Sequence, residues 1–327
     1  MKRTMLAILL GGLSCSPALA ESSLTGVLMP FAPDKQVEIE AQALAVFGSE
    51  IEQNGIDVSV RITDFEIRGL LQETEDLRSS LRFRFHGLGV DSSDPALPDG
   101  FVDVFFGGGN TYVLEDDWSL SWGLGVGYAG QSYDEDGDLS FDRDDGFYGA
   151  AGIAGTKQLD EFTSVTVLLD WDGNRSVFPD VPLPGILYTR RLQTEQPLVV
   201  TVGFPFTSVV WNPVERLRVE ATFFFPESVE AEVTYLLTDE WDVFVSLGRQ
   251  AESYATNALP EDRRLFFEQS RLEVGTNWRP EEEVEVSFGV GLAYNQEFTT
   301  GFDRRDDNTF RDLDDAPFIR AGLRLAF

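Results

Sequence analysis

The chain ends on Ile319-Arg320-Ala321-Gly322-Leu323-Arg324-Leu325-Ala326-Phe327, in which apolar side chains alternate with polar or small ones. Because successive side chains of a strand point to opposite sides, Ile319, Leu323 and Phe327 share one face and Arg320 and Arg324 share the other. One face suits lipid and the other suits water. The terminal strand of a soluble domain tends to fray, whereas a membrane barrel must pair its last strand with its first. The stretch therefore predicts the last strand of a transmembrane β-barrel.

The same alternation recurs along the chain from Val37 onward, in segments separated by turn residues. Counting them gives about sixteen strands if one strand ends and the next begins at Phe204-Pro205, and about fifteen if a single strand continues through this point. Without that break, the long connections would change sides halfway along the chain. The four segments between residues 198 and 237 have the weakest patterns. We therefore expect an all-β fold, an antiparallel transmembrane β-barrel of about 14 to 16 strands, as a single domain over residues 21–327.

The connections between these segments differ in length in a regular way. Short acidic turns at 114–117, 158–161, 238–240 and 280–283 all land on one side of the expected barrel, and long connections at 131–146, 172–185, 250–264 and 298–317 land on the other. Outer-membrane barrels have short periplasmic turns and long outer loops. Tryptophans stand beside the short-turn side, where an interfacial girdle belongs: Trp118, Trp211, Trp241 and Trp278. The alternative is that these tryptophans belong to the core of a soluble β-sandwich. Such a fold would need neither long loops on one side only nor the terminal Phe327.

The first twenty residues have the pattern of a secretory signal peptide. Lys2 and Arg3 precede the apolar run 5–13, and Ala18-Leu19-Ala20 offers small residues for cleavage after Ala20. We therefore expect residues 1–20 to be removed. The alternative is a lipoprotein modified at Cys15, although such sites usually carry Leu where Gly12 stands.

Two stretches resemble known outer-membrane proteins. The last strand, with its final Phe, resembles the C-terminal assembly signal of bacterial outer-membrane β-barrel proteins. The stretch from Gly203-Phe204-Pro205-Phe206 to Trp211-Asn212-Pro213, with Leu217–Glu220 and Ala231–Thr238, is similar to a family of outer-membrane β-barrel proteins of uncharacterised function. The resemblance implies the outer membrane of a Gram-negative-type bacterium, surrounding outer-membrane lipid, and the barrel-assembly machinery and periplasmic chaperones as partners during biogenesis. It implies no catalytic residue and no substrate, and it leaves the oligomeric state open.

The composition excludes several classes of partner and fold. The formal net charge is −31, and it becomes −33 if Lys2 and Arg3 leave with the signal peptide. Such a surface repels nucleic acid, so no nucleic-acid partner is expected. The 26 Phe and 6 Trp are too many for a disordered acidic chain, which is poor in aromatic residues.

The single histidine, His86, lies in a stretch that alternates basic and aromatic residues. If Phe83 and Phe85 face lipid, then Arg82, Arg84 and His86 face the lumen, and we expect Arg61 to join them as pore-lining residues. A barrel phospholipase or protease needs an imidazole placed near the rim to take a proton. A mid-strand histidine among arginines does not fit that role, so we expect no enzymatic activity.

The acidic segment at 134–145 is the best candidate for a metal site. Asp134, Asp136 and Asp138 stand at alternate positions and Asp145 follows, which is a spacing that Ca²⁺ favours. Leu139 stands where a calcium loop needs its sharp-turn glycine. A weak Ca²⁺ site competes with the simpler interpretation of a solvated, self-repelling loop. No other cofactor is indicated.

These patterns favour passive permeation of small solutes or ions, because about sixteen strands leave room for an aqueous channel. The alternative is a non-conducting barrel that serves as a structural or surface-interaction protein. An inward-folded long loop, or bulky side chains meeting across the lumen, would favour that alternative.

Overall fold

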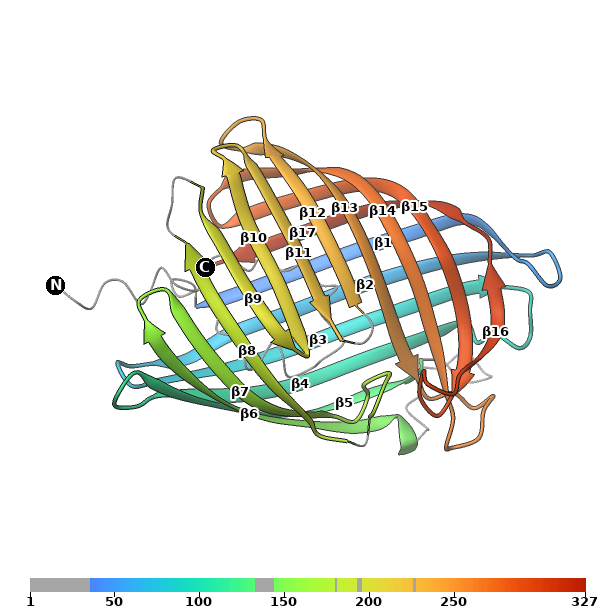
Figure 1. Cartoon of the computed structure of the whole chain (residues 1–327). Helices are drawn as coiled ribbons and strands as arrows, with labels where there is room; N and C mark the ends of the chain where they lie inside the picture. Colours follow the sequence, from blue (N-terminus) through green and yellow to red (C-terminus); the bar gives the residue numbers. More distant parts are fainter. Residues whose placement is uncertain (1–35, 133–143, 180, 193–195, 226–227) are drawn as a thin grey trace.

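Antiparallel strands form one closed sheet in the computed structural model of the chain (Figure 1). The structure describes residues 36–132, 144–179, 181–192, 196–225 and 228–327. The expected signal peptide at 1–20, with Cys15, lies outside these ranges. Among the described residues, no helix is long and apolar enough to cross a membrane.

The described residues form 17 strands and one short 3-10 helix, η3 (Asp144–Gly146). The strands of the first half are β1 (Val37–Ile51), β2 (Ile56–Glu73), β3 (Leu77–Ser92), β4 (Gly100–Val113), β5 (Trp118–Gln131), β6 (Phe147–Asp160), β7 (Thr163–Asp172), β8 (Leu183–Leu192) and β9 (Leu198–Phe204). Those of the second half are β10 (Phe206–Val214), β11 (Leu217–Phe224), β12 (Ser228–Leu236), β13 (Trp241–Tyr254), β14 (Arg264–Glu281), β15 (Val284–Gly301), β16 (Asn308–Leu313) and β17 (Ala316–Ala326).

The sheet closes because its last strand pairs with its first. β17 runs antiparallel to β1, with Ala43 opposite Ala321 and Glu38 opposite Ala326. β16 and β17 both lie between β15 and β1, so they form one interrupted strand position of the barrel. The 17 strands therefore fill sixteen positions. The expected break at Phe204-Pro205 is confirmed, since β9 and β10 pair as antiparallel neighbours on either side of it.

Side chains alternate between the outside and the inside of the barrel as the last strand predicted. On β17, Ile319 is 53% exposed, and Phe327, directly after this strand, is 58% exposed, while Arg320 points inward and donates from Nε to Oε1 of Glu273 at 2.7 Å. Apolar side chains remain exposed around the outer wall on most of the other strands. This apolar outer wall is what a lipid environment requires of a membrane barrel.

The two ends of the barrel differ as expected. The start of β1 and the C-terminus lie at the same end of the barrel (Figure 1), which we call the terminal end, and the short turns at 114–117, 161–162, 237–240 and 282–283 lie there too. The longer connections at 93–99, 173–182, 255–263 and 302–307 lie at the opposite end, called the loop end. The four predicted girdle tryptophans stand beside terminal-end turns with their rings partly exposed, and Trp241 stacks on Trp278 at 5.8 Å between ring centroids.

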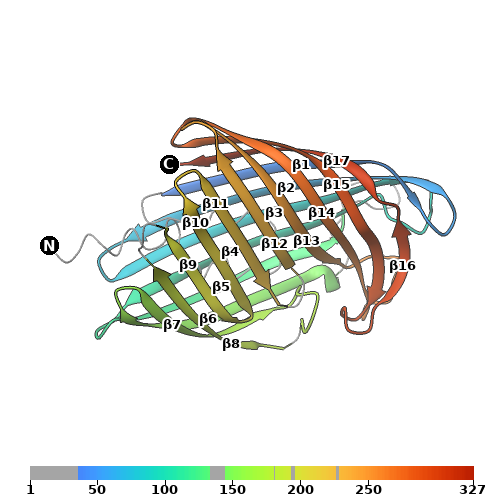
Figure 2. The ribbon, with the colours of Figure 1, turned by 45° about the horizontal axis from the view of Figure 1, so that its top comes forward.

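A hydrophobic core fills part of the barrel near the loop end. It is built from inward-facing side chains of β1–β4 on one wall and of β13–β17 on the other, including Val60, Leu88, Phe101, Phe267 and Phe318. Figure 2 shows that β1–β4 run across the view while β10–β14 cross them steeply. The two walls therefore pack face to face at this end. The lumen near the loop end is therefore filled largely by apolar side chains on this side, whereas the lumen toward the terminal end is polar.

Candidate functional site

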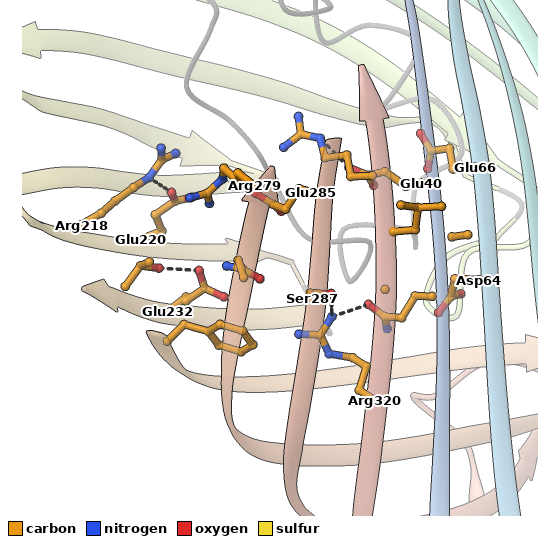
Figure 3. A pocket seen from close by; sticks show the side chains of 18 residues that line it. Glu40, Asp64, Glu66, Arg218, Glu220, Glu232, Arg279, Glu285, Ser287 and Arg320 are labelled. Carbon is orange, nitrogen blue, oxygen red and sulfur yellow. Dashed lines mark hydrogen bonds and ion pairs between the residues drawn. The ribbon is translucent and has the colours of Figure 1, made fainter. Parts of the chain in front are cut away.

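A polar cavity of about 140 Å³ occupies the lumen toward the terminal end, and we call it the terminal cavity. Figure 3 shows Arg320 and Ser287 in the middle, with Glu220 and Glu232 on one wall and Glu40, Asp64 and Glu66 on the other. β11 and β12 place Glu220 directly opposite Glu232 across the strand pair. Like charges in that position repel each other. The cavity is thus lined by two acidic walls with arginines between them.

The arginines of the terminal cavity are held by carboxylates. Arg279 donates from Nε to Oε2 of Glu285 at 2.6 Å and also pairs with Asp242, and Arg324 donates from Nε to Oε1 of Glu38 at 2.6 Å. Arg320 donates to Glu273 and Ser287. Partial burial strengthens such charge-assisted bonds. The arginines are therefore fixed along the wall, and the field that a solute meets depends on the remaining carboxylates.

Three of the four predicted lumen residues do point into the barrel, from neighbouring inward positions of β3. Arg82, Arg84 and His86 are buried to 6%, 6% and 2% exposure. Arg82 forms two hydrogen bonds with Glu66, at 3.1 and 2.9 Å, and Arg84 pairs with Asp103. His86 Nδ1 lies 2.6 Å from Oδ1 of Asp64. Because each has a carboxylate partner on β2 or β4, the three form a packed wall, and their role in permeation stays a prediction.

Arg61 is the exception, and its placement in the lumen was wrong. Its neighbours Val60 and Ile62 are buried inside the barrel, so the Arg61 side chain faces outward, with 70% exposure and Asp91 at 3.8 Å. The reason lies in the core near the loop end, where β2 turns apolar side chains inward. A pattern that assigns polar residues to the lumen therefore gives the wrong face at this end.

The end of β13 crosses the lumen. Residues 250–256, which we call the crossing segment, are buried throughout. Ala255 donates its N–H to the carbonyl of Ala129 at 3.0 Å, and its carbonyl accepts from the N–H of Gln131 at 2.9 Å, both at the end of β5. The crossing segment thus connects two walls that are far apart along the sheet.

The side chain of Tyr254 fills the space inside the barrel next to this connection. Its ring centroid lies 4.9 Å from that of Phe101 and 6.4 Å from that of His86, so side chains of β13 meet side chains of β3 and β4 across the barrel. Tyr254 is fully buried. This contact could not be predicted from the sequence, because the crossing segment lacks the alternation by which a strand is recognised.

A small polar cavity of about 10 Å³ lies beside the crossing segment, and we call its lining the polar constriction. Ser253 donates to the carbonyl of Asn174 at 2.9 Å, and Tyr148 donates to Oδ1 of Asp103 at 2.7 Å. The complete lining comprises Arg84, Asp103, Asp172, Asn174, Ser176, Ala251, Glu252 and Ser253. The Asp64–His86 pair connects the two polar regions, since Asp64 lines the terminal cavity and His86 is two residues from Arg84.

The predicted metal site falls mostly outside the described residues. Asp134, Asp136 and Asp138 belong to the segment 133–143, and Asp145 lies in η3. Over the described ranges, no group of three or more His, Cys, Asp or Glu side chains could hold a metal ion. Weak Ca²⁺ binding at this loop stays a prediction.

The described acidic connections at the loop end are neutralised by arginines. Asp303 accepts from Arg305 at 2.8 Å, and Asp94 accepts from Nε of Arg311 at 2.6 Å. The hydrogen bond from Arg311 lowers the pKa of Asp94; burial opposes this shift, and the N–H of Ala96 adds to it. Within the acidic stretch 303–315, Asp303 thus pairs with Arg305, whereas Arg311 turns to the connection between β3 and β4.

Comparison with known proteins gives likenesses of fold. No protein-family model and no curated protein matches the chain. Among solved structures, the fold is similar to an outer-membrane channel from Pseudomonas putida F1, with 12% identity, 90% of this chain and 96% of that chain covered, and a TM-score of 0.40. It is also similar to the Pseudomonas putida toluene transporter TodX (9% identity, 95% and 93% covered, TM-score 0.35) and to the translocator domain of the autotransporter NalP from Neisseria meningitidis (9% identity, 93% and 91% covered, TM-score 0.30).

At these identities and TM-scores, the likenesses carry no conclusion about activity. The chain's own architecture decides its class. A closed antiparallel barrel with an apolar outer wall and an aromatic girdle satisfies all backbone hydrogen bonds within lipid. The chain is an outer-membrane β-barrel of Gram-negative type.

Proposed function

We propose that the protein is an outer-membrane channel for small ions and solutes, and that the conformation described here is its closed state. The terminal cavity carries this proposal. A barrel that served only as a scaffold would have no need for a charged cavity in its lumen, whereas a channel needs a polar path with sites that bind its solute weakly.

The route through the loop-end half follows from what fills it. The hydrophobic core excludes ions from the side between β1–β4 and β13–β17. Charged and hydroxyl side chains line the polar constriction beside this core. A solute would therefore pass from the terminal cavity by Asp64 and His86 to the constriction, and would leave at the loop end once the crossing segment moves.

A second candidate function is a non-conducting structural or surface-interaction barrel. One observation favours it: Tyr254 meets Phe101 and His86 across the lumen. This is the kind of contact that would make the closure permanent. Neither candidate function involves catalysis, and the single histidine, His86, is buried with its Nδ1 2.6 Å from Oδ1 of Asp64.

Conductance in planar bilayers tests the two candidates. Tyr254→Ser removes the ring that fills the crossing, while Tyr235→Ser removes an exposed ring from the outer wall and serves as the matched control. We expect rare openings for the wild type and for the control, and frequent openings for Tyr254→Ser. Silence of all three proteins at saturating insertion would favour the non-conducting barrel.

Ion preference gives a second readout of the same proposal. The acidic stretch 134–145 follows β5 and precedes β6 in the sequence, and we expect its charge to act on entering ions over about 8 Å at physiological salt. We expect a modest preference for cations that shrinks as salt is raised, or when Asp134, Asp136 and Asp138 are changed to Asn. A preference for anions would show that the arginines of the wall set the field.

A further inference from the structure

The outer wall of the barrel has a hollow of about 780 Å³ on the strands that close the sheet. These strands are β14, β15, β17, β1 and β2, which lie side by side in that order (Figure 2). The wall is hollowed here because the outward side chains of Ala43, Ala45 and Ala321 are small. We call this feature the outer hollow, and its lining includes these three alanines, Phe288, Val290, Ile319 and Arg61.

The outer hollow belongs to the part of the wall that faces lipid. Three large apolar side chains beside the alanines stay more than half exposed: Phe288, Val290 and Ile319, at 53%, 60% and 53%. Its volume lies within the range of roughly 300–1,000 Å³ that small-molecule pockets span. An apolar, lipid-facing hollow of this size fits an acyl chain.

Arg61 lies at the edge of the outer hollow, at the level where the apolar wall ends. Along β2 toward the terminal end, the next outward large side chains are the apolar Phe65 and Ile67, whereas toward the loop end the outward residues are Ser59 and Asp57. The pairing with β3 places Phe85 beside Phe65 and Gly89 beside Arg61. A cation at this level stands where the headgroups of the outer leaflet begin.

We propose that the outer hollow, with Arg61, is a binding site for a phosphorylated, acylated lipid of the outer leaflet. An acyl chain lies over the three alanines, and the guanidinium of Arg61 donates to a phosphate oxygen. Arginine suits this role because its planar fork matches phosphate geometry. The 3.8 Å ion pair with the exposed Asp91 is long, and exposed pairs of this kind contribute little. A second copy of the chain is the rival occupant, and the oligomeric state of the variants below distinguishes it from a lipid.

Lipid retention in native mass spectrometry of the purified full-length barrel tests the site. The probe is bisphosphorylated hexa-acyl lipid A, compared with the same lipid after its phosphates are removed. Arg61→Gln should weaken retention of the phosphorylated lipid about tenfold, which corresponds to about 1.4 kcal/mol, and should leave retention of the dephosphorylated lipid unchanged. Ala321→Phe and Ala45→Leu fill the outer hollow and should reduce retention of both lipids.

Matched controls separate this site from a general effect of charge or bulk. Arg190→Gln removes an exposed cation from β8, and Ala151→Leu adds bulk to the outward face of β6. Neither should change retention. Equal retention by the wild type and Arg61→Gln, or an equal loss in the controls, would overturn the proposal. A dimer that disappears in Ala321→Phe would overturn it in favour of a second copy.

Discussion

Phe105 depends on two glycines for its position inside the barrel. Its ring is fully buried and lies against Gly107 on its own strand and Gly125 on β5. A Cβ atom at Gly125 would stand 2.1 Å from Cζ of Phe105, and one at Gly107 would stand 2.7 Å from the same ring. A side chain at either position would have to displace a ring that has no free space around it.

Gly125→Val should therefore destabilise the barrel, by about 1–3 kcal/mol if the cost is that of an overpacked core. Gly69→Val is the control, because no atom lies within 4 Å of a Cβ built there. Urea unfolding in lipid vesicles, followed by tryptophan fluorescence, measures both variants. Equal unfolding midpoints for the two variants would show that Phe105 can turn away at no cost.

The Asp94–Arg311 pair predicts a dependence on pH at the loop end. The pKa of Asp94 is lower in the folded protein than in the unfolded chain, so the pair stabilises the fold above the unfolded pKa, about 3.9. That stability declines below this pH and is lost once the pH falls through the folded pKa. Asp94→Asn should therefore have a lower melting temperature than the wild type at neutral pH, and the difference should shrink in acid. Heat modifiability on gels at the two pH values measures it, and a difference that does not change with pH would contradict this account.

At the scale of single residues, the direction of a side chain was predicted correctly where polar residues face the lumen and apolar residues face lipid. Arg82, Arg84 and His86 point inward on β3 as their alternation with phenylalanines predicted. The same reasoning placed Arg61 on the wrong face, because the loop-end part of β2 points its valine and isoleucine side chains inward. The carboxylate partners of the predicted residues could not be found from the sequence, because each lies on another strand.

Among the elements, β3 gives the clearest test of which face meets lipid. Phe83 faces outward near the middle of the strand, and its ring meets Phe65 edge-on at 6.3 Å between centroids. Phe83→Arg should destabilise by about 2–4 kcal/mol, as expected for a cation near the bilayer midplane. Leu77→Arg, at the terminal-end start of β3, is the matched control and should cost about 0–1 kcal/mol. Unfolding in bilayers of fixed thickness measures both, and equal costs would argue against a lipid-facing β3.

The strands were predictable in number and order, and less so in length. β13 continues to Tyr254, although its last residues are buried on both faces and lack the period of two by which a strand is recognised. β1 runs to Ile51 through an irregular register after Val46. The weak segments between 198 and 237 are strands, because short hairpins pair them with their neighbours.

For the whole molecule, the hydrogen bonds that close the sheet extend to Phe327. The Phe327 carbonyl accepts from the N–H groups of Gln36 and Val37 at 2.6 and 3.2 Å, and its own N–H donates to Val37 at 2.8 Å. Deletion of Phe327 should leave most of the protein unfolded or degraded before it reaches the outer membrane. The measurement is the amount of heat-modifiable protein in outer-membrane fractions, with Phe327→Tyr as the aromatic control. Equal amounts for the deletion and the wild type would contradict a role in closure.

The closed barrel could be predicted as a whole because lipid forces every backbone group to find a partner within the chain. The division of its lumen could not. The crossing segment binds β5 through backbone groups, which every residue carries, and the hydrophobic core has the same residue types as a lipid-facing wall. Composition alone cannot tell which of two apolar faces points inward.

The pairing of β17 with β1 also determines the order of events during assembly. Glu38 and Arg324, which join the two strands, stand 286 positions apart, so the sheet has two open edges until the end of the chain arrives. An open edge pairs with any strand of matching pattern. A synthetic peptide of residues 316–327 should therefore occupy the edge of β1 during refolding and trap an unclosed sheet, while the same peptide added after closure should find no edge to bind.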